Sequence, residues 1–373
     1  MPSNSKSSIP PQIKGYQVLD RLGKGSFGTV FLAIKDSEKQ VCALKLIDAP
    51  RQDIDKQLIE NEIFVMRNVK SPFLCNMYDT FKHGEQTCIA LELITGEDLF
   101  NFQYKMKRFD QNTIRFYLAE LVLAIECLHN NHVIHRDIKP ENVMLDRRGH
   151  VKLVDFGASK VNIRKGQLTR TFCGTYQFMA PEIIKKQSYG HSVDVWSLGC
   201  LAFDLQLGKS PFSAGSEKKT IEKVLNGSVN YPRKVSAMFE SLVSSMLKYD
   251  PAERIDISDL KQAKYFKSID WEKLKKQKVK APYEFKQNDD RFHKILKNSG
   301  VKKVMDPFSG FDYQEPTTNV LNNTNYNTAQ RKKSACSITA RAATYPPPSL
   351  CSLLSAGYYF QPCQGHWYDH VMF

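Results

Sequence analysis

The chain has 373 residues, 42% of them hydrophobic and 25% charged, so it can hold one large domain or two small ones with a substantial core. No uninterrupted apolar run is long enough to cross a bilayer, and neither a secretion signal nor a lipid-attachment motif is visible. The nine cysteines lack CxxC spacing, which is typical of buried thiols in a reduced protein. We therefore expect a cytoplasmic protein without a transmembrane segment, with entry into the nucleus left open.

The positive charge is concentrated late in the chain. Lys and Arg number 53 against 39 acids, a net charge of +14, and residues 261–303 alone hold 14 basic and 5 acidic side chains. One interpretation is a surface for an acidic membrane or a polyanion. The interpretation that we favour is a basic tail lying on an acidic surface of its own domain. Because we find no stacking platform of aromatic residues that accompanies this stretch, we do not expect nucleic acid as a partner.

The first third of the chain is predicted to be rich in strands. Residues 1–14 are expected to be disordered, and residues 16–46 read as three strands separated by turns, because apolar residues alternate or run in short blocks. A helix is expected over 54–69, where the apolar residues follow helical spacing. A buried strand follows at 88–94, and the segment after Thr95 is interpreted as a linker.

The chain then becomes mainly helical. Apolar helices are expected over 114–129, 193–208 and 238–247. A small β-rich part joined to a larger helical part predicts a two-lobe α+β fold, with a ligand site between the lobes. After about residue 266 the chain is basic and is expected to be extended. After about residue 316 it is rich in Asn, Thr, Ser and Pro, which is typical of disorder.

A glycine pattern, G-x-G-x-x-G-x-V, lies between the first two predicted strands. It is formed by Gly23, Lys24, Gly25, Ser26, Phe27, Gly28, Thr29 and Val30. Glycines let the backbone approach phosphate groups closely. A dinucleotide-binding loop would be followed by a helix, and a Walker loop would end in G-K-[ST]. Here a strand follows, which favours a lid over ATP, although an ordinary glycine hairpin is the alternative for this motif taken alone.

Lys45 lies on the next predicted strand, among apolar residues, where an unpaired charge would be costly. Its expected partners are the phosphate oxygens of ATP and an acid on the following helix. Glu62 is the expected acid because it lies among the apolar positions of that helix. Glu60 is the competing candidate, although it points about 160° away around the helix.

Four further motifs follow in a fixed order. They are His135-Arg136-Asp137-Ile138-Lys139-Pro140-Glu141-Asn142, Asp155-Phe156-Gly157, Ala180-Pro181-Glu182 and Asp194-Val195-Trp196. Their order and spacing are typical of protein kinases. Phosphoryl transfer needs an oriented hydroxyl and neutralised phosphate charge more than covalent chemistry. An isolated Asp in a loop is usually a turn or cap residue, but here the concordant motifs favour catalysis.

Each polar residue type in these motifs suits one part of that chemistry. Asp137 can orient the substrate hydroxyl and accept its proton, and Lys139 can steady the transferred γ-phosphate. Asp155 and Asn142 offer the hard oxygen ligands that Mg²⁺ prefers. ATP and Mg²⁺ are therefore the expected cofactors.

Residues 15–266 thus resemble a eukaryotic protein kinase domain, with a small lobe at 15–93 and a large lobe at 94–266. Lys139 within HRDIKPEN resembles Ser/Thr kinases, because tyrosine kinases usually carry Ala-Ala-Arg there. The TRTFCGT segment at 169–175 is similar to the AGC group, and residues 267–315 resemble its tail. Within that group the chain looks most like protein kinase C and protein kinase N.

The resemblance implies roles for residues that the motifs alone do not explain. Leu91 would be the gatekeeper, and Glu92 and Leu93 would offer hinge backbone to adenine. The ring would lie between Val30, Ala43 and Met144. Thr171 would be phosphorylated by an upstream kinase, and its phosphate would pair with Arg136 and Lys160. A hydrophobic motif would dock on the small lobe through Phe308, Phe311, Asp312 and Tyr313.

The resemblance also implies a substrate class. Asp98, Glu141 and Asp204 match positions at which related kinases select basic substrates, so proteins with Arg at −3 from the phosphorylated Ser or Thr are the expected partners. Met179 would help to form the pocket for the residue after the phosphoacceptor. We expect a monomer, and the sequence leaves open an inhibitory partner.

The chain also departs from the family pattern. Tyr176-Gln177 replaces the usual Pro-Glu, which puts the upstream substrate preference in doubt, and Glu97 replaces a glycine. Residues 316–373 match no known pattern, although Ser334, after Arg331-Lys332-Lys333, fits the expected substrate pattern. A basic disordered tail is the interpretation of this segment that we favour. The competing functions are a scaffolding pseudokinase and a nucleic-acid-binding protein, but Lys45, Asp137 and Asp155 are all retained.

Overall fold

The computed structural model describes residues 12–25, 28–50 and 52–298. Several predictions concern residues outside these ranges and stay predictions. They concern Ser26, Phe27, Phe308, Phe311, Asp312, Tyr313 and Ser334.

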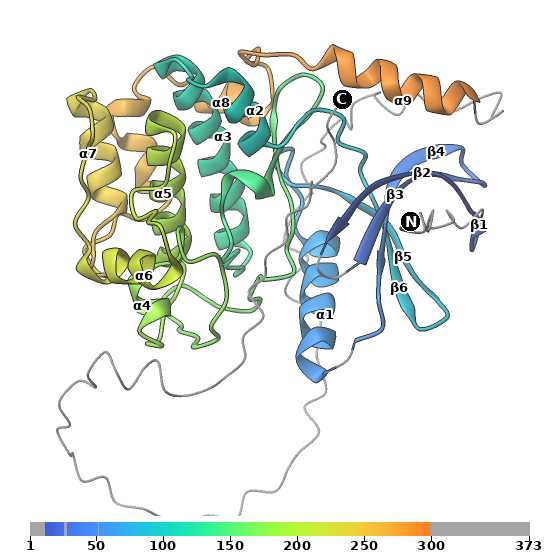
Figure 1. Cartoon of the computed structure of the whole chain (residues 1–373), viewed down its shortest axis with the longest axis horizontal. Coiled ribbons are helices and arrows are strands. Elements are labelled where there is room, and N and C mark those ends of the chain that lie inside the picture. Colours follow the sequence, from blue (N-terminus) through green and yellow to red (C-terminus); the bar gives the residue numbers. More distant parts are fainter. Residues whose placement is uncertain (1–11, 26–27, 51, 299–373) are drawn as a thin grey trace, which may run out of the picture. The chain divides into compact units, whose positions relative to one another are not determined.

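Within the described residues, six antiparallel strands form one curled sheet in the order β1-β2-β3-β4-β6-β5 (Figure 1). The strands are β1 (Gln12–Ile13), β2 (Tyr16–Gly25), β3 (Gly28–Lys35), β4 (Gln40–Ile47), β5 (Met77–His83) and β6 (Gln86–Leu91). Lys45 lies on β4, between two neighbouring strands, opposite Val30 on β3 and Ile89 on β6. This register carries the lysine into the interior of the small lobe.

The predicted disorder of residues 1–14 is wrong at its end. Gln12–Ile13 forms β1, which pairs with β2, and the Ile13 side chain is 1% exposed. Burial of a large aliphatic side chain gives this short segment a reason to be ordered. The helix expected after the third strand is α1 (Asp53–Asn68), which runs beside the sheet (Figure 1).

The second part of the chain is mainly helical and includes a two-stranded sheet of β7 (Val143–Leu145) and β8 (Val151–Leu153). Its helices are α2 (Leu99–Met106), α3 (Gln111–Asn130), α4 (Pro181–Ile184), α5 (Ser192–Leu207), α6 (Glu217–Asn226), α7 (Ala237–Met246) and α8 (Trp271–Lys275), with short 3-10 turns η1 (Pro140–Asn142), η2 (Asp259–Gln262) and η3 (Lys264–Phe266). The segment predicted as a linker therefore contains α2. It begins at Asp98, whose carboxylate accepts a hydrogen bond from the Asn101 amide and so caps the helix.

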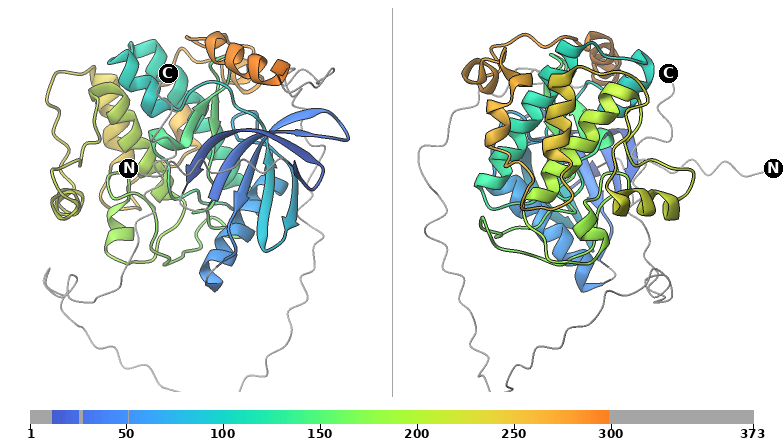
Figure 2. Two further views of the ribbon diagram at one scale, coloured as in Figure 1. Left: turned by 45° about the vertical axis from the view of Figure 1, so that its right-hand side comes forward. Right: turned by 90° about the vertical axis from the view of Figure 1, so that its left-hand side faces the viewer.

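The core of this lobe is built on α3 and α5, which pack on each other, with α7 against α5 (Figure 2). Most side chains around both α3 and α5 are buried, as expected of central helices with apolar residues on every side. The two lobes are also tied by backbone hydrogen bonds. The Leu153 amide donates to the Phe73 carbonyl, and the Cys75 amide donates to the Leu153 carbonyl.

The chain after residue 266 was expected to be extended, but its described part contains α8 and α9 (Lys286–Asn298). Leu296 of α9 is buried in an apolar cluster with Leu32 and Ile34 of β3, and Phe292 and Ile295 pack against that cluster. These three apolar residues have helical spacing, so a helix places them on one face, where they pack on the small lobe while the rest of the segment stays polar. No helix among the described residues is long and apolar enough to span a membrane.

Candidate active site

A buried ion pair joins β4 to α1. Lys45 Nζ lies 2.5 Å from Glu62 Oε1, and the two side chains are only 3% and 6% exposed. Burial opposes the charge on Lys45, but the charges of Glu62 and Asp155 outweigh it and raise the lysine pKa. Glu60 lies on the exposed side of the helix, 4.0 Å from Lys56. Of the two acids weighed from the sequence, the structure brings Glu62 to Lys45.

The glycine loop is the tip of the β2–β3 hairpin, with Gly23 opposite Val30 and Gly25 opposite Gly28. A side chain at Gly28 would collide with the backbone carbonyl of Leu46 on β4. Glycine at this position therefore lets the hairpin lie close to the strand that carries Lys45.

The catalytic-loop residues form a compact buried network. Asp137 Oδ2 lies 2.8 Å from Lys139 Nζ and accepts a hydrogen bond of 2.9 Å from Asn142 Nδ2. The Thr175 hydroxyl donates to Asp137 Oδ1 at 2.8 Å, and Lys139 Nζ donates to the same hydroxyl at 2.9 Å. A hydroxyl group thus lies between the carboxylate and the ammonium, which is the arrangement that a substrate hydroxyl needs for proton transfer.

The donor set beside this network fits Mg²⁺. Because the Asn142 amide nitrogen donates to Asp137, the Asn142 Oδ1 atom is left buried with no hydrogen-bond partner among the described residues. Asp155 offers a carboxylate, close enough to influence the pKa values of both Lys45 and Lys139. No group of three or more His, Cys, Asp or Glu in the described part of the chain could hold a metal without help. Mg²⁺ usually combines one or two carboxylates with substrate phosphates, and Asp155 and Asn142 carry oxygen atoms of the kind that it binds.

The catalytic loop is held in place by α5. The fully buried Asp194 accepts hydrogen bonds from the amides of His135 at 2.9 Å and Arg136 at 2.8 Å. Its other contact is with His129 Nε2 at 2.8 Å. Burial alone would raise the pKa of Asp194, but these hydrogen bonds and the nearby histidines outweigh burial and lower it. The sequence motif indicated Asp194, whereas no sequence signal pointed to His129.

The Arg136 guanidinium is directed at the activation segment. It donates to the carbonyls of Ala158 at 2.6 Å and Ser159 at 3.2 Å, and to the Tyr189 hydroxyl at 3.0 Å. The Tyr189 hydroxyl in turn donates to the Thr171 carbonyl. Arg136 and Thr171 are therefore linked through one hydroxyl.

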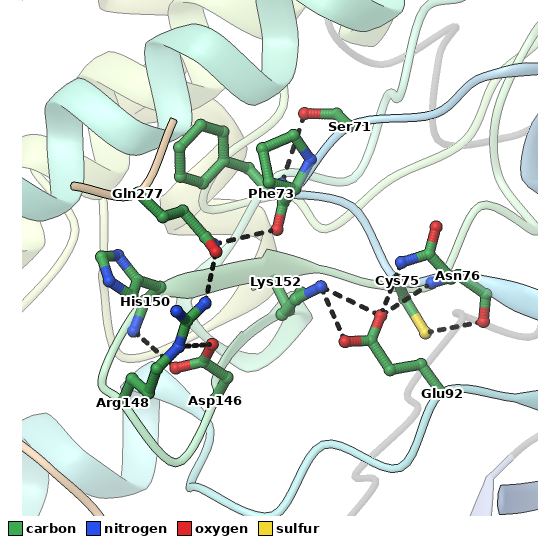
Figure 3. A network of polar contacts seen from close by, with 11 residues as sticks. Ser71, Phe73, Cys75, Asn76, Glu92, Asp146, Arg148, His150, Lys152 and Gln277 are labelled. Atoms are coloured by element: carbon green, nitrogen blue, oxygen red, sulfur yellow. Dashed lines mark hydrogen bonds and ion pairs between the residues drawn. The ribbon is translucent and has the colours of Figure 1, made fainter. Parts of the chain in front are cut away.

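The segment after β6 is fixed by a polar network (Figure 3). Lys152 Nζ, on β8, lies 2.7 Å from Glu92 Oε1 and 3.0 Å from Oε2. The side-chain amide of Asn76 donates to Glu92 Oε2 at 2.9 Å, and the Glu92 amide donates to the Asn76 carbonyl at 2.8 Å. Both lobes therefore hold Glu92, and no sequence signal singled out Lys152.

The residues expected around adenine are partly brought together. Val30, Ala43, Leu91 and Leu93 belong to one apolar cluster of the small lobe. Met144 is not part of that cluster; it lies on β7 in a β-bridge with Asp98.

The three predicted recognition acids lie on different elements and influence one another electrostatically. Asp98 caps α2, Glu141 is on η1 and Asp204 is near the end of α5. Burial raises the pKa of Glu141, and the charges of Asp137 and Asp98 add to the effect. Burial and the charge of Glu141 raise the pKa of Asp204 to about 6. The Glu141 Oε2 atom is buried and has no hydrogen-bond partner among the described residues. The guanidinium of a substrate arginine could supply the missing donor.

Met179, predicted to shape the pocket for the next substrate residue, is buried in the large-lobe core. Its side chain also approaches Gly174 of the activation segment: a Cβ added at Gly174 would lie 3.5 Å from the Met179 methyl carbon.

Comparison with known proteins agrees with this geometry. Residues 16–266 match the protein kinase domain. Ribosomal protein S6 kinase beta of Caenorhabditis elegans is 33% identical, over 94% of this chain and 70% of that protein. Protein kinase C of Drosophila melanogaster is 35% identical, over 79% of this chain but only 43% of that protein. RAC-beta serine/threonine-protein kinase A of Xenopus laevis is 33% identical, over 75% of this chain and 59% of that protein.

These relatives are all AGC-group kinases, which confirms the resemblance stated from the sequence motifs. The two-lobe α+β fold predicted from the sequence is confirmed as well. The chain belongs to the protein kinase family and is a Ser/Thr protein kinase of the AGC group.

Proposed function

We propose that the chain transfers the γ-phosphate of ATP to Ser or Thr through the network around Asp137. The observation that carries this proposal is the half-buried Thr175 hydroxyl, held between Asp137 Oδ1 at 2.8 Å and Lys139 Nζ at 2.9 Å. A substrate hydroxyl in this position would donate its proton to Asp137 while Lys139 offsets the charge on the transferred group.

Binding of the nucleotide is assigned to residues of both lobes. Lys45, oriented by Glu62, would contact phosphate oxygens under the glycine loop. Leu91 would border the adenine site, Glu92 and Leu93 would offer backbone hydrogen bonds to it, and Val30, Ala43 and Met144 would enclose the ring. Asn142 and Asp155 would hold Mg²⁺, which neutralises phosphate charge when bound.

We assign basic proteins as the substrate class. Asp98 is buried and Glu141 and Asp204 are half-buried, and one carboxylate oxygen of Glu141 has no partner among the described residues. A guanidinium forms bidentate hydrogen bonds with carboxylates and stays charged, so it would satisfy the oxygen and relieve the repulsion between the acids. Arg at −3 is therefore the proposed recognition element, with Met179 lining the site of the following residue.

Activation is assigned to phosphorylation of Thr171 by an upstream kinase. Arg136 already reaches the Thr171 backbone through Tyr189, so a phosphate on Thr171 would attract the same guanidinium. Residues 267–315 are assigned as the tail of the kinase, and 308–313 as its hydrophobic motif.

A positional peptide library with Mg·ATP tests the proposal, before and after an upstream kinase has phosphorylated Thr171. We expect transfer to Ser and Thr that is selective for Arg at −3 and stronger after phosphorylation. Transfer without any preference for a basic residue would contradict the substrate class while leaving phosphoryl transfer intact. Equal activity of a Thr171→Ala variant would contradict the activation step.

A further inference from the structure

Gln103 of α2 is a buried polar residue to which the motifs assign no role. Its side chain is 8% exposed, and its amide nitrogen donates to the Asp204 carbonyl at 2.8 Å and to Asp204 Oδ1 at 3.1 Å. Both acceptors of the amide nitrogen therefore belong to one residue of α5.

The helix that carries Gln103 is itself tied to another recognition acid. The Asp98 carboxylate accepts hydrogen bonds from the Asn101 amide at 2.8 Å and from its side chain at 2.7 Å, which starts α2. Gln103 follows in the next turn and reaches Asp204. One short helix thus orients two of the three acids.

The surroundings of Asp204 show what the amide does electrostatically. The titratable groups that face Asp204 are Glu141 from η1 and Cys200 from one turn earlier in α5. Asp204 forms no ion pair with any residue that the structure describes. Its carbonyl also accepts from the Gly208 amide, but the hydrogen bond that its carboxylate accepts there comes from Gln103. Burial raises the pKa of Asp204 to about 6 and Glu141 adds to this, whereas the Gln103 hydrogen bond opposes both.

We propose that Gln103 is a positioning residue for substrate recognition, whose amide directs the Asp204 carboxylate so that a substrate arginine meets Asp204 and Glu141 together. This inference rests on the proposed substrate class. Gln suits the position because it provides two donors to Asp204 without adding charge. A Glu would bring a carboxylate against Asp204, and a Met of similar size would provide no donor.

The test compares wild type with Gln103→Met, using two peptides that differ only in Arg or Ala at −3. The ratio of their kcat/KM values isolates recognition of the arginine. Ionisations of the enzyme that change both kcat/KM values equally cancel in this ratio. In wild type this ratio is expected to fall as the pH drops through about 6, where Asp204 becomes protonated. In Gln103→Met we expect the ratio at pH 7.5 to fall by about 2- to 10-fold because, of the two lost hydrogen bonds, only the one to the Asp204 carboxylate orients the group that meets the arginine. The midpoint of its pH dependence is expected to move upward, because the bond that favoured the carboxylate is gone.

Gln111→Met is the matched control. The Gln111 amide, at the start of α3, donates to the side chain of Gln206, two residues after Asp204, and therefore offers a similar link to α5 without touching an acid. This variant is expected to keep the wild-type ratio and the wild-type pH midpoint.

A double-mutant cycle separates positioning from general damage to the fold. In an Asp204→Asn background, Gln103→Met should change the ratio no further, because the carboxylate through which it acts is absent. An unchanged pH midpoint in Gln103→Met, or an equal loss in the Asp204→Asn background, would overturn the inference. A wild-type enzyme with no arginine preference would overturn the proposed substrate class and this inference with it, whereas a preference insensitive to Gln103 would overturn the inference alone.

Discussion

The ion pair between Lys152 and Glu92 gives a quantitative test of how the two lobes are joined (Figure 3). The Lys152 side chain is 6% exposed and the Glu92 side chain 17%, at a distance of 2.7 Å. Removing one partner of a buried pair costs about 3–5 kcal/mol, because the other charge is left uncompensated. Glu92 keeps the two donors of Asn76, so we expect Lys152→Met to lower the free energy of unfolding by about 2–3 kcal/mol.

The chain contains a matched control in the pair of Lys105 and Glu97. The Glu97 side chain is 18% exposed, close to the value for Glu92, but the Lys105 side chain is 67% exposed. Exposed pairs contribute about 0–1 kcal/mol, so Lys105→Met should change stability far less than Lys152→Met. Urea unfolding of both variants, followed by fluorescence and circular dichroism together, measures the difference.

A second variant tests the cause of the effect. Adding Glu92→Gln to Lys152→Met removes the uncompensated charge while keeping an acceptor for Asn76, so the double variant should be more stable than Lys152→Met alone, by about 1 kcal/mol or more. If Lys152→Met costs no more than Lys105→Met, or if Glu92→Gln fails to restore stability, burial does not determine the cost of breaking this ion pair.

Two further predictions concern buried charges. The pKa of Asp204 is about 6 in the folded chain against an ordinary value of 3.8, so folding of the ionised form is penalised, and stability falls as the pH rises from about 4 to about 6. Asp204→Asn should therefore stabilise the chain by roughly 2–3 kcal/mol at pH 7 and by nothing below pH 4. Urea unfolding at both pH values measures the two effects, and equal stabilisation at both would refute this prediction. Arg254 forms a buried ion pair with Glu182 at 2.8 Å and lies over the Trp196 ring at 5.1 Å. Arg254→Met should therefore lower the free energy of unfolding by about 3–5 kcal/mol, and a decrease below about 1 kcal/mol in the same assay would contradict the prediction.

The sequence was most informative where a motif and a periodic pattern agreed. Helical spacing separated Glu62 from Glu60, and the structure brings Glu62 to Lys45. Asp137 and Asn142 belong to one short motif, and the structure joins them by a hydrogen bond of 2.9 Å. Glycines followed by a strand rather than a helix distinguished this hairpin from a dinucleotide-binding loop.

The sequence was least informative where contacts join distant positions through ordinary residues. Lys152 and Glu92 are 60 positions apart, and Gln103 and Asp204 are 101 apart, so no local pattern could pair them. The α2 helix is short, and its start depends on one Asp cap, which is also a common turn residue. The tail helix α9 has a mainly polar and charged sequence with only three apolar residues at helical spacing, too weak a pattern to predict a helix.

The central claim, phosphoryl transfer at Asp137, is tested most directly by comparing wild type with Asp137→Asn in transfer of labelled phosphate from Mg·ATP to an Arg(−3) Ser peptide. Asn can keep the hydrogen bond from Thr175 but cannot take a proton from a hydroxyl. We expect nucleotide binding, measured in parallel by calorimetry, to persist in the variant while transfer falls by about 100-fold or more. Transfer at the wild-type rate by a variant that binds nucleotide normally would contradict the account.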